Sequence, residues 1–229
     1  MTTEAFLSLL QFTDGLFPGG AYAHSFGLES YVQAGAVRNA AGVEAFLRAL
    51  LEGSSGPTDA VVAMCAWRGG WSNDLETCLR VDQTFDAMKP AAELRTASRQ
   101  MGRQVLRIAS RQTAHRLVAD LFRGVERGVT PGHHPVAFGA VGSVMGWRRE
   151  ETAAAYLYST SAAVVAAALR LLPLGQSTGQ HILWSVQPSI GRLAKEAEDK
   201  GLEELWSFAP GLEIAAMRHA RLDGRLFRS

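Results

Sequence analysis

The hydrophobic side chains recur at the spacing of an α-helix along most of the chain. The clearest apolar face, with positions at i, i+3, i+4, i+7 and i+8, consists of Val43, Phe46, Leu47, Leu50 and Leu51. No stretch shows the sustained alternation of polar and β-branched residues that indicates a strand. The pattern therefore predicts an all-α protein. Because the gaps between segments are short, we expect a single-domain helical bundle of roughly ten helices over residues 1–229.

Glycine and proline mark the expected ends of these helices. The helix that carries the apolar face is predicted to stop at Gly53 and at the pair Gly56 and Pro57. Pro188 is predicted to separate two further helices. The other segments with helical spacing cover residues 58–67, 72–85, 90–112, 115–127, 135 onward, 150–172, 178–187, 189–199 and 210–219.

Composition narrows the class of protein. The chain has 229 residues, of which 47% are hydrophobic, and 23 basic side chains balance 22 acidic ones. This composition provides a buried core and excludes a disordered or histone-like chain. Two cysteines cannot form a disulfide framework, and residues 1–10 carry no basic side chain, so we expect a cytoplasmic protein. Residues 152–169 are uncharged but rich in alanine and serine, which favours a buried helix over a membrane span.

A glycine turn near the N-terminus is the first candidate for a functional site. Gly19 and Gly20 follow Pro18, but the sequence lacks the lysine of a P-loop, so nucleotide binding is not expected. The general interpretation is a tight structural turn. The neighbouring Tyr22 and His24 suit a contact surface.

Histidines give weak support for a metal site. The six histidines lack H-E-x-x-H spacing, and no C-x-x-C pair is present, so no preformed metal site or resident cofactor is predicted. Imidazole also suits a transient contact with nickel. The alternative function is that of a metal-dependent all-α hydrolase, which would use the loop pair His133 and His134 together with Glu150.

Arginines recur at every fourth residue from Arg95 to Arg111. A four-residue step drifts by about 40° around a helix, so the row forms a winding ribbon. It could pair with carboxylates of its own fold, with phosphates or with an acidic protein. A nucleic-acid interface would require interleaved aromatic residues and a basic net charge. Since the row has no aromatic residues and the net charge is +1, nucleic acid is the third-ranked hypothesis and no nucleic-acid partner is expected.

Two segments near the C-terminus complete the candidates. Residues 173–180 break a helix at Gly175, Gln176 and Gly179, which indicates a structural hinge. The tail, residues 221–229, places Leu226 and Phe227 between two arginines. An apolar chain end of this kind is expected to dock, either on its own domain or on a partner.

Five segments together resemble a known family. Residues 21–29, 93–102, 134–139, 172–180 and 225–229 are similar, in order, to motifs of the urease accessory protein family UreF. The resemblance spans nearly the whole chain. Each motif alone is weak, and the specificity comes from their order and from the matching length.

The resemblance implies an all-α, homodimeric, non-enzymatic protein that works with UreD and the GTPase UreG. That family bridges UreD and UreG, regulates the GTPase, and supports GTP-dependent nickel insertion into the urease apoenzyme, with nickel handled only transiently. By position, Tyr22 and Arg225 match residues implicated in recruiting UreG. The tail residues expected to bind UreD are Leu226, Phe227 and Arg228. The matched structural turns are Gly19, Gly20, Gly175, Gln176 and Gly179.

Overall fold

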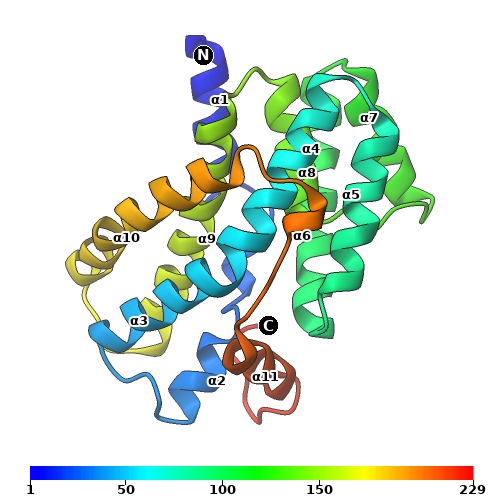
Figure 1. Cartoon of the computed structure of the whole chain (residues 1–229). Coiled ribbons are helices and arrows are strands. Elements are labelled where there is room, and N and C mark those ends of the chain that lie inside the picture. The colour runs from blue at the N-terminus through cyan, green and yellow to red at the C-terminus, as the bar shows by residue number, and fades with distance from the viewer. Residues whose placement is uncertain (229) are drawn as a thin grey trace.

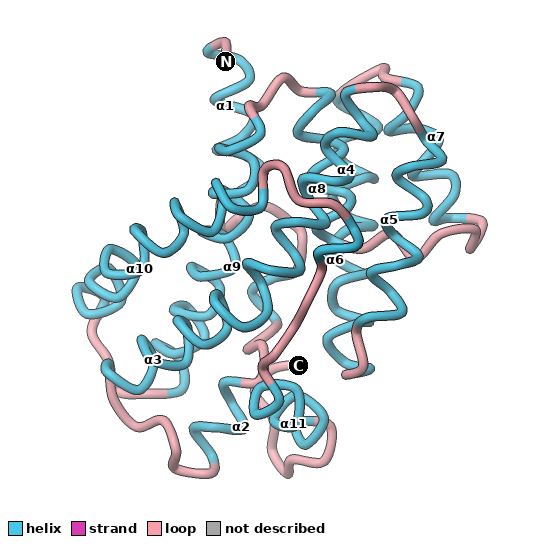
Figure 2. The backbone as a smooth tube through the Cα atoms, viewed as in Figure 1, coloured by secondary structure: helices cyan, strands magenta, loops and turns pink. Residues whose placement is uncertain are grey.

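The computed structural model describes residues 1–228, and Ser229, the last residue of the expected tail, lies outside the described residues. Within residues 1–228 all regular structure is helical, and no strand is present (Figures 1 and 2). The prediction of an all-α protein is therefore confirmed. The helices are α1 (Thr3–Thr13), η1 (Ala21–Ala23), α2 (Leu28–Gln33), α3 (Ala40–Leu50), η2 (Leu51–Ala60), α4 (Val61–Trp71), α5 (Leu75–Met88), α6 (Ala92–Gln112), α7 (Arg116–Glu126), α8 (His134–Val144), α9 (Arg149–Leu171), α10 (Gln176–Ala197), η3 (Leu202–Glu204) and α11 (Pro210–His219).

Helices α4 and α8 form the centre of the bundle. Figure 1 shows α5, α6 and α7 on one side of this pair, and α3, α9 and α10 on the other. A Cβ atom built at Gly139 of α8 would lie only 2.0 Å from the carbonyl oxygen of Ala63 in α4. Glycine is required here because the two backbones approach more closely than any side chain permits. The close pair holds the two halves of the bundle around one hydrophobic cluster.

The helix that begins with α3 does not stop at Gly53 or at Gly56 and Pro57, so that prediction is wrong. α3 continues through the π-helical segment η2 directly into α4. A π-turn changes the pairing of its carbonyl groups, which then accept partners from outside the helix. The N–H of Phe208 donates to the Gly53 carbonyl at 2.8 Å. A segment about 150 residues away in sequence thus stabilises η2, where the glycines and the proline would otherwise favour the end of the helix.

The predicted helix end at Pro188 is also wrong, because α10 is one continuous helix. A proline inside a helix removes one N–H and displaces the carbonyl of the preceding turn. Arg48 of α3 lies at this point and donates from its guanidinium to the Ser185 carbonyl at 2.8 Å. The same guanidinium lies 3.4 Å from the Ser189 hydroxyl. Packing against α3 therefore supports the helix through its proline.

Helix α9 is long and apolar enough to cross a membrane by length and composition, with a mean hydropathy of 1.4. More than half of that stretch is buried inside the protein, where α9 packs against α10, α4 and α8. The expectation of a buried helix rich in small residues agrees with this packing. Alanine and serine suit such a position because they let neighbouring helices approach closely.

Candidate functional site at the docked C-terminal tail

Helices α2 and α11, which are far apart in the sequence, lie side by side in Figures 1 and 2. α2 begins after Gly27, whose φ of +87° is in the left-handed region that favours glycine. A Cβ atom at this position would lie 3.5 Å from the backbone of α11 at Leu212 and Ala216. The Ser30 hydroxyl donates to the Ala215 carbonyl at 2.9 Å. These contacts fix α11, and therefore the start of the tail, against the N-terminal part of the chain.

A buried histidine lies between two carboxylates at the base of this site. In His219, Nε2 lies 2.8 Å from Glu29 Oε2, and Nδ1 lies 2.8 Å from Glu93 Oε2. Glu29 is 1% exposed and His219 is fully buried. Each ring nitrogen thus has a carboxylate oxygen within hydrogen-bond distance, so the ring is held from both sides. The network joins α2, α6 and α11.

The same glutamate holds the tail through its backbone. The N–H of Leu226 donates to Glu29 Oε1 at 2.7 Å, and the N–H of Phe227 donates to Glu29 Oε2 at 3.1 Å. One residue further, the N–H of Arg228 donates to the Ala23 carbonyl at 2.8 Å. The Phe227 side chain is only 4% exposed and belongs to the hydrophobic core. The tail therefore docks on its own chain, by an apolar anchor and three backbone hydrogen bonds.

Arg170 joins the tail to the N-terminal turn. Its guanidinium lies 4.3 Å from the centre of the Tyr22 ring and 4.4 Å from the centre of the Phe227 ring. It also donates to the Tyr22 carbonyl at 3.1 Å. A planar guanidinium stacks well on aromatic faces, so one side chain couples two segments about 200 residues apart. Tyr22 remains 68% exposed in this arrangement.

The remaining tail side chains face outward. Arg225 forms an ion pair with Glu93 at 2.7 Å while its side chain stays 38% exposed. Leu226 is 52% exposed, and Arg228 is also exposed. The structure thus brings together, around Arg170 and Glu29, all five residues that the sequence assigns to partner binding.

Hydrogen bonding makes this site sensitive to acid. Burial alone would raise the pKa of Glu29, but the N–H of Leu226, the ring of His219 and the N–H of Phe227 together lower this pKa below its ordinary value of 4.5. A carboxyl group whose pKa is lowered in the folded state stabilises it fully above the unfolded value. That stabilisation is lost as the pH falls through the lowered pKa.

We therefore expect the tail to be docked at neutral pH and released in acid, at a pH below 4.5. The backbone amide signals of Leu226 and Phe227 in a pH titration by nuclear magnetic resonance measure this release. Glu93 is a second carboxyl group that contacts the same histidine. The matched control is Glu29→Gln, because it removes the ionisable group of Glu29 alone and should abolish the transition at these two amides. Amide signals that titrate identically in the Glu29→Gln variant would assign the transition to another group.

The turns predicted from the sequence have different outcomes, because Gln176 and Gly179 lie inside α10 and form no turn. Gly20 has a φ of +87°, and Gly19 donates its N–H to the Phe17 carbonyl at 2.7 Å in the same turn. Gly179 faces α9, where an added Cβ atom would lie 3.1 Å from Val165 and Leu169. Gly175 has extended backbone and open space around it, and Gln176 is simply the first residue of α10.

The histidine pair does not form the hydrolase site considered from sequence. The His133 side chain is buried, and its Nδ1 lies 3.0 Å from the Ser98 hydroxyl and its Nε2 2.8 Å from Asp86 Oδ1. His134 packs against the Tyr156 ring, and burial lowers its pKa to about 4. Glu150 is exposed beyond the far end of α8, a helix of 11 residues and so about 16 Å long. These three side chains do not meet.

Metal binding is not supported by the geometry either. In the part of the chain that the structure describes, no three histidine, cysteine, aspartate or glutamate side chains gather so that they could hold a metal ion. Both cysteines are buried, and burial raises the pKa of the Cys78 thiol to about 12.

Four residues of the site are missing from the sequence-based assignments: Glu29, Glu93, Arg170 and His219. Glu29 and Glu93 lie inside two of the motifs that carry the family resemblance, which was the only signal available for them. Nothing in the sequence pairs either glutamate with a histidine more than 120 residues away.

The fold and the site define an all-helical protein whose docked tail and N-terminal turn present an aromatic ring, a leucine and arginines for contact with other molecules. Comparison with known proteins identifies the family. The family model UreF matches residues 37–187, and the chain belongs to the UreF family.

Full-length relatives agree with this membership. The urease accessory protein UreF of Trichodesmium erythraeum is 33% identical over 221 residues, which cover 96% of this chain and 95% of the relative. Proteins of the same name from Geobacillus kaustophilus and Cereibacter sphaeroides are each 33% identical, over 235 and 227 residues, and cover 100% and 99% of this chain and 100% of each relative. The chain is thus a non-catalytic accessory protein of urease maturation, from a family that participates in nickel insertion.

Proposed function

We propose that this chain acts as a homodimer that bridges UreD and the GTPase UreG, regulates that GTPase, and so supports GTP-dependent nickel insertion into the urease apoenzyme. In this proposal the protein is cytoplasmic, residues 1–229 form one domain, and nickel is the cargo of the complex rather than a resident cofactor. The family resemblance supplies the identity of the partners. The structure contributes the arrangement of the residues that would meet them.

The observation that carries the proposal is the stack of Tyr22, Arg170 and Phe227. Aromatic and arginine side chains are the usual anchors of protein interfaces. Tyr22 contributes such a ring with most of its surface free, and Arg225 lies in the neighbouring tail segment. We assign UreG to this exposed face, which includes both residues.

We assign UreD to the tail itself, through Leu226, Phe227 and Arg228. Leu226 and Arg228 are exposed while the tail is docked, whereas Phe227 is buried. A partner could therefore contact Leu226 and Arg228 without displacing the tail from its site on the chain. Use of Phe227 as an anchor for UreD would require the tail to leave Glu29. Because Arg170 stacks on both Phe227 and Tyr22, this movement would also change the contact between Arg170 and Tyr22.

Co-expression with UreD and UreG tests the proposal, followed by size-exclusion chromatography with mass measurement. We expect one complex that holds two copies of each protein. A chain that ends at Ala220 should form less of this complex, because the docked segment is missing. A chain that elutes free of both partners would contradict the proposed function.

A further inference from the structure

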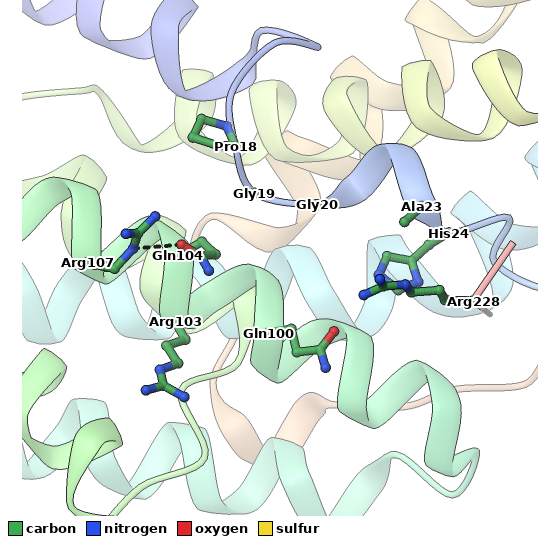
Figure 3. Close-up of a pocket in the computed structure, with 10 residues that line it drawn as sticks. All are labelled: Pro18, Gly19, Gly20, Ala23, His24, Gln100, Arg103, Gln104, Arg107 and Arg228. Carbon is green, nitrogen blue, oxygen red and sulfur yellow. Dashed lines mark hydrogen bonds between the residues drawn. The ribbon is translucent and has the colours of Figure 1, made fainter.

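A basic groove lies beside the docked tail and gathers three features that are separate in the sequence. The glycine turn at Gly19 and Gly20 forms one wall, and α6 forms the opposite wall with Gln100 and Gln104 (Figure 3). Figure 3 shows Arg107 next to Gln104 at one end, and His24 next to Arg228 at the other end. The cavity has a volume of about 530 Å³, which is within the range of about 300–1,000 Å³ typical of sites for small molecules.

Positive charge in this groove is only partly balanced. Along α6, Arg99 pairs with Asp86 at 2.5 Å, and Arg103 pairs with Glu126 at 2.7 Å. Arg107 instead has a neutral partner, because its Nε donates to Gln104 Oε1 at 2.7 Å. Within residues 1–228, no carboxylate forms an ion pair with Arg107 or with Arg228. Arg107 of the row and Arg228 of the tail therefore line the groove without a carboxylate partner among the described residues.

The neighbouring histidine responds to this charge. His24 lines the groove, and burial, followed by the positive charge of Arg228, lowers its pKa to about 4. Its ring is therefore neutral at physiological pH and adds no third cation. Glu93 and His219 are the other charged groups that act on His24, and they act in opposite directions. The charge of the groove at neutral pH thus comes from its arginines.

We propose that this groove binds a small polyanion, a molecule that carries two or more phosphate or carboxylate groups. Guanidinium groups match both kinds of oxyanion with paired N–H donors. Because Arg107 and Arg228 stand at opposite ends, the site suits an extended ligand with a negative group at each end. Gln100 and Gln104 line the space between and can donate to further oxygens. The proposal is independent of UreD and UreG.

Titration calorimetry of the full chain alone, at low salt, with tripolyphosphate and with citrate tests this site. We expect saturable binding that weakens as salt is added, since ions screen exposed charges. Arg107→Gln should weaken the affinity about tenfold, because one charge-assisted contact is lost. The matched control is Arg111→Gln, one turn further along α6, which removes the same charge from an exposed residue that does not line the groove.

The outcomes separate clearly. Binding that is weakened in Arg107→Gln and retained in Arg111→Gln supports the site, and a preference for tripolyphosphate or for citrate identifies phosphate or carboxylate as its ligand. Absence of binding at millimolar concentrations overturns the proposal, as does equal weakening in both variants, which would indicate only a general effect of charge. Thermal unfolding of each variant, followed by circular dichroism, confirms that the helices are intact before binding is compared. None of these results depends on whether the chain recruits UreG.

Discussion

Replacement of Glu29 by alanine should release the C-terminal tail and lower the free energy of unfolding by about 3–5 kcal/mol. The carboxylate is buried and accepts hydrogen bonds from the His219 ring and from the N–H groups of Leu226 and Phe227. Without it, the histidine retains only Glu93, and two backbone donors lose their partner in a buried place. Unfolding in urea gives the free energy, and the amide signals of the tail report its release.

A surface carboxylate provides the matched control for this substitution. Glu196 pairs with Arg192 at 2.8 Å on the exposed side of α10. Removal of an exposed ion pair typically costs less than about 1 kcal/mol, so Glu196→Ala should change stability little. If Glu29→Ala and Glu196→Ala lowered stability equally and left the tail amides unshifted, Glu29 would not be the residue that holds the tail.

Local sequence signals predicted much of the helical framework. The helix expected over residues 210–219 coincides with α11, and the one expected over residues 150–172 differs from α9 by a single residue at each end. Each begins at a clear chemical signal, which is a proline in the first turn of α11 and two acidic residues in the first turn of α9. Such signals act within a few residues and can therefore be read from the sequence.

The same signals failed where distant contacts decide the structure. Gly56 and Pro57 normally end a helix, yet the backbone of Phe208 accommodates the irregular turn that contains them. Pro188 is tolerated because Arg48 of another helix stabilises the chain beside it. No local pattern contains that information.

The candidate site shows the same division. Motif resemblance identified Tyr22 and the tail as separate elements, and the apolar character of Phe227 predicted that the tail would dock. The residues that join these elements, Arg170 and the pair Glu29 and His219, emerge only from the fold. The arginine row is explained in part by ion pairs within the fold, as its simplest interpretation predicted, and two of its members, Arg103 and Arg107, line the groove.

Loss of UreG recruitment on mutation of Tyr22 or Arg225 is the second large effect that we expect. Tyr22 presents an exposed ring, and Arg225 keeps more than a third of its side chain exposed beside Glu93. Truncation of an interface anchor typically costs about 2 kcal/mol or more, which is roughly a thirtyfold loss of affinity. The fold should remain intact, because Tyr22 is mostly outside the core and the Arg225 ion pair is partly exposed.

Controls of the same residue types lie elsewhere on the chain. Tyr158→Ala removes a tyrosine that is 40% exposed, three turns from Arg170 along α9. Arg221→Ala removes an exposed arginine from the start of the tail. Neither substitution touches the stack of Tyr22, Arg170 and Phe227, so both variants should recruit UreG as the unmodified chain does.

The most direct measurement is the amount of UreG retained when each variant is captured together with UreD. If Tyr22 and the docked tail form the recruitment surface, Tyr22→Ala and Arg225→Ala will retain UreD but lose most of the UreG, while Tyr158→Ala and Arg221→Ala will retain both. Undiminished UreG in both Tyr22→Ala and Arg225→Ala would contradict the central claim that this surface recruits the GTPase.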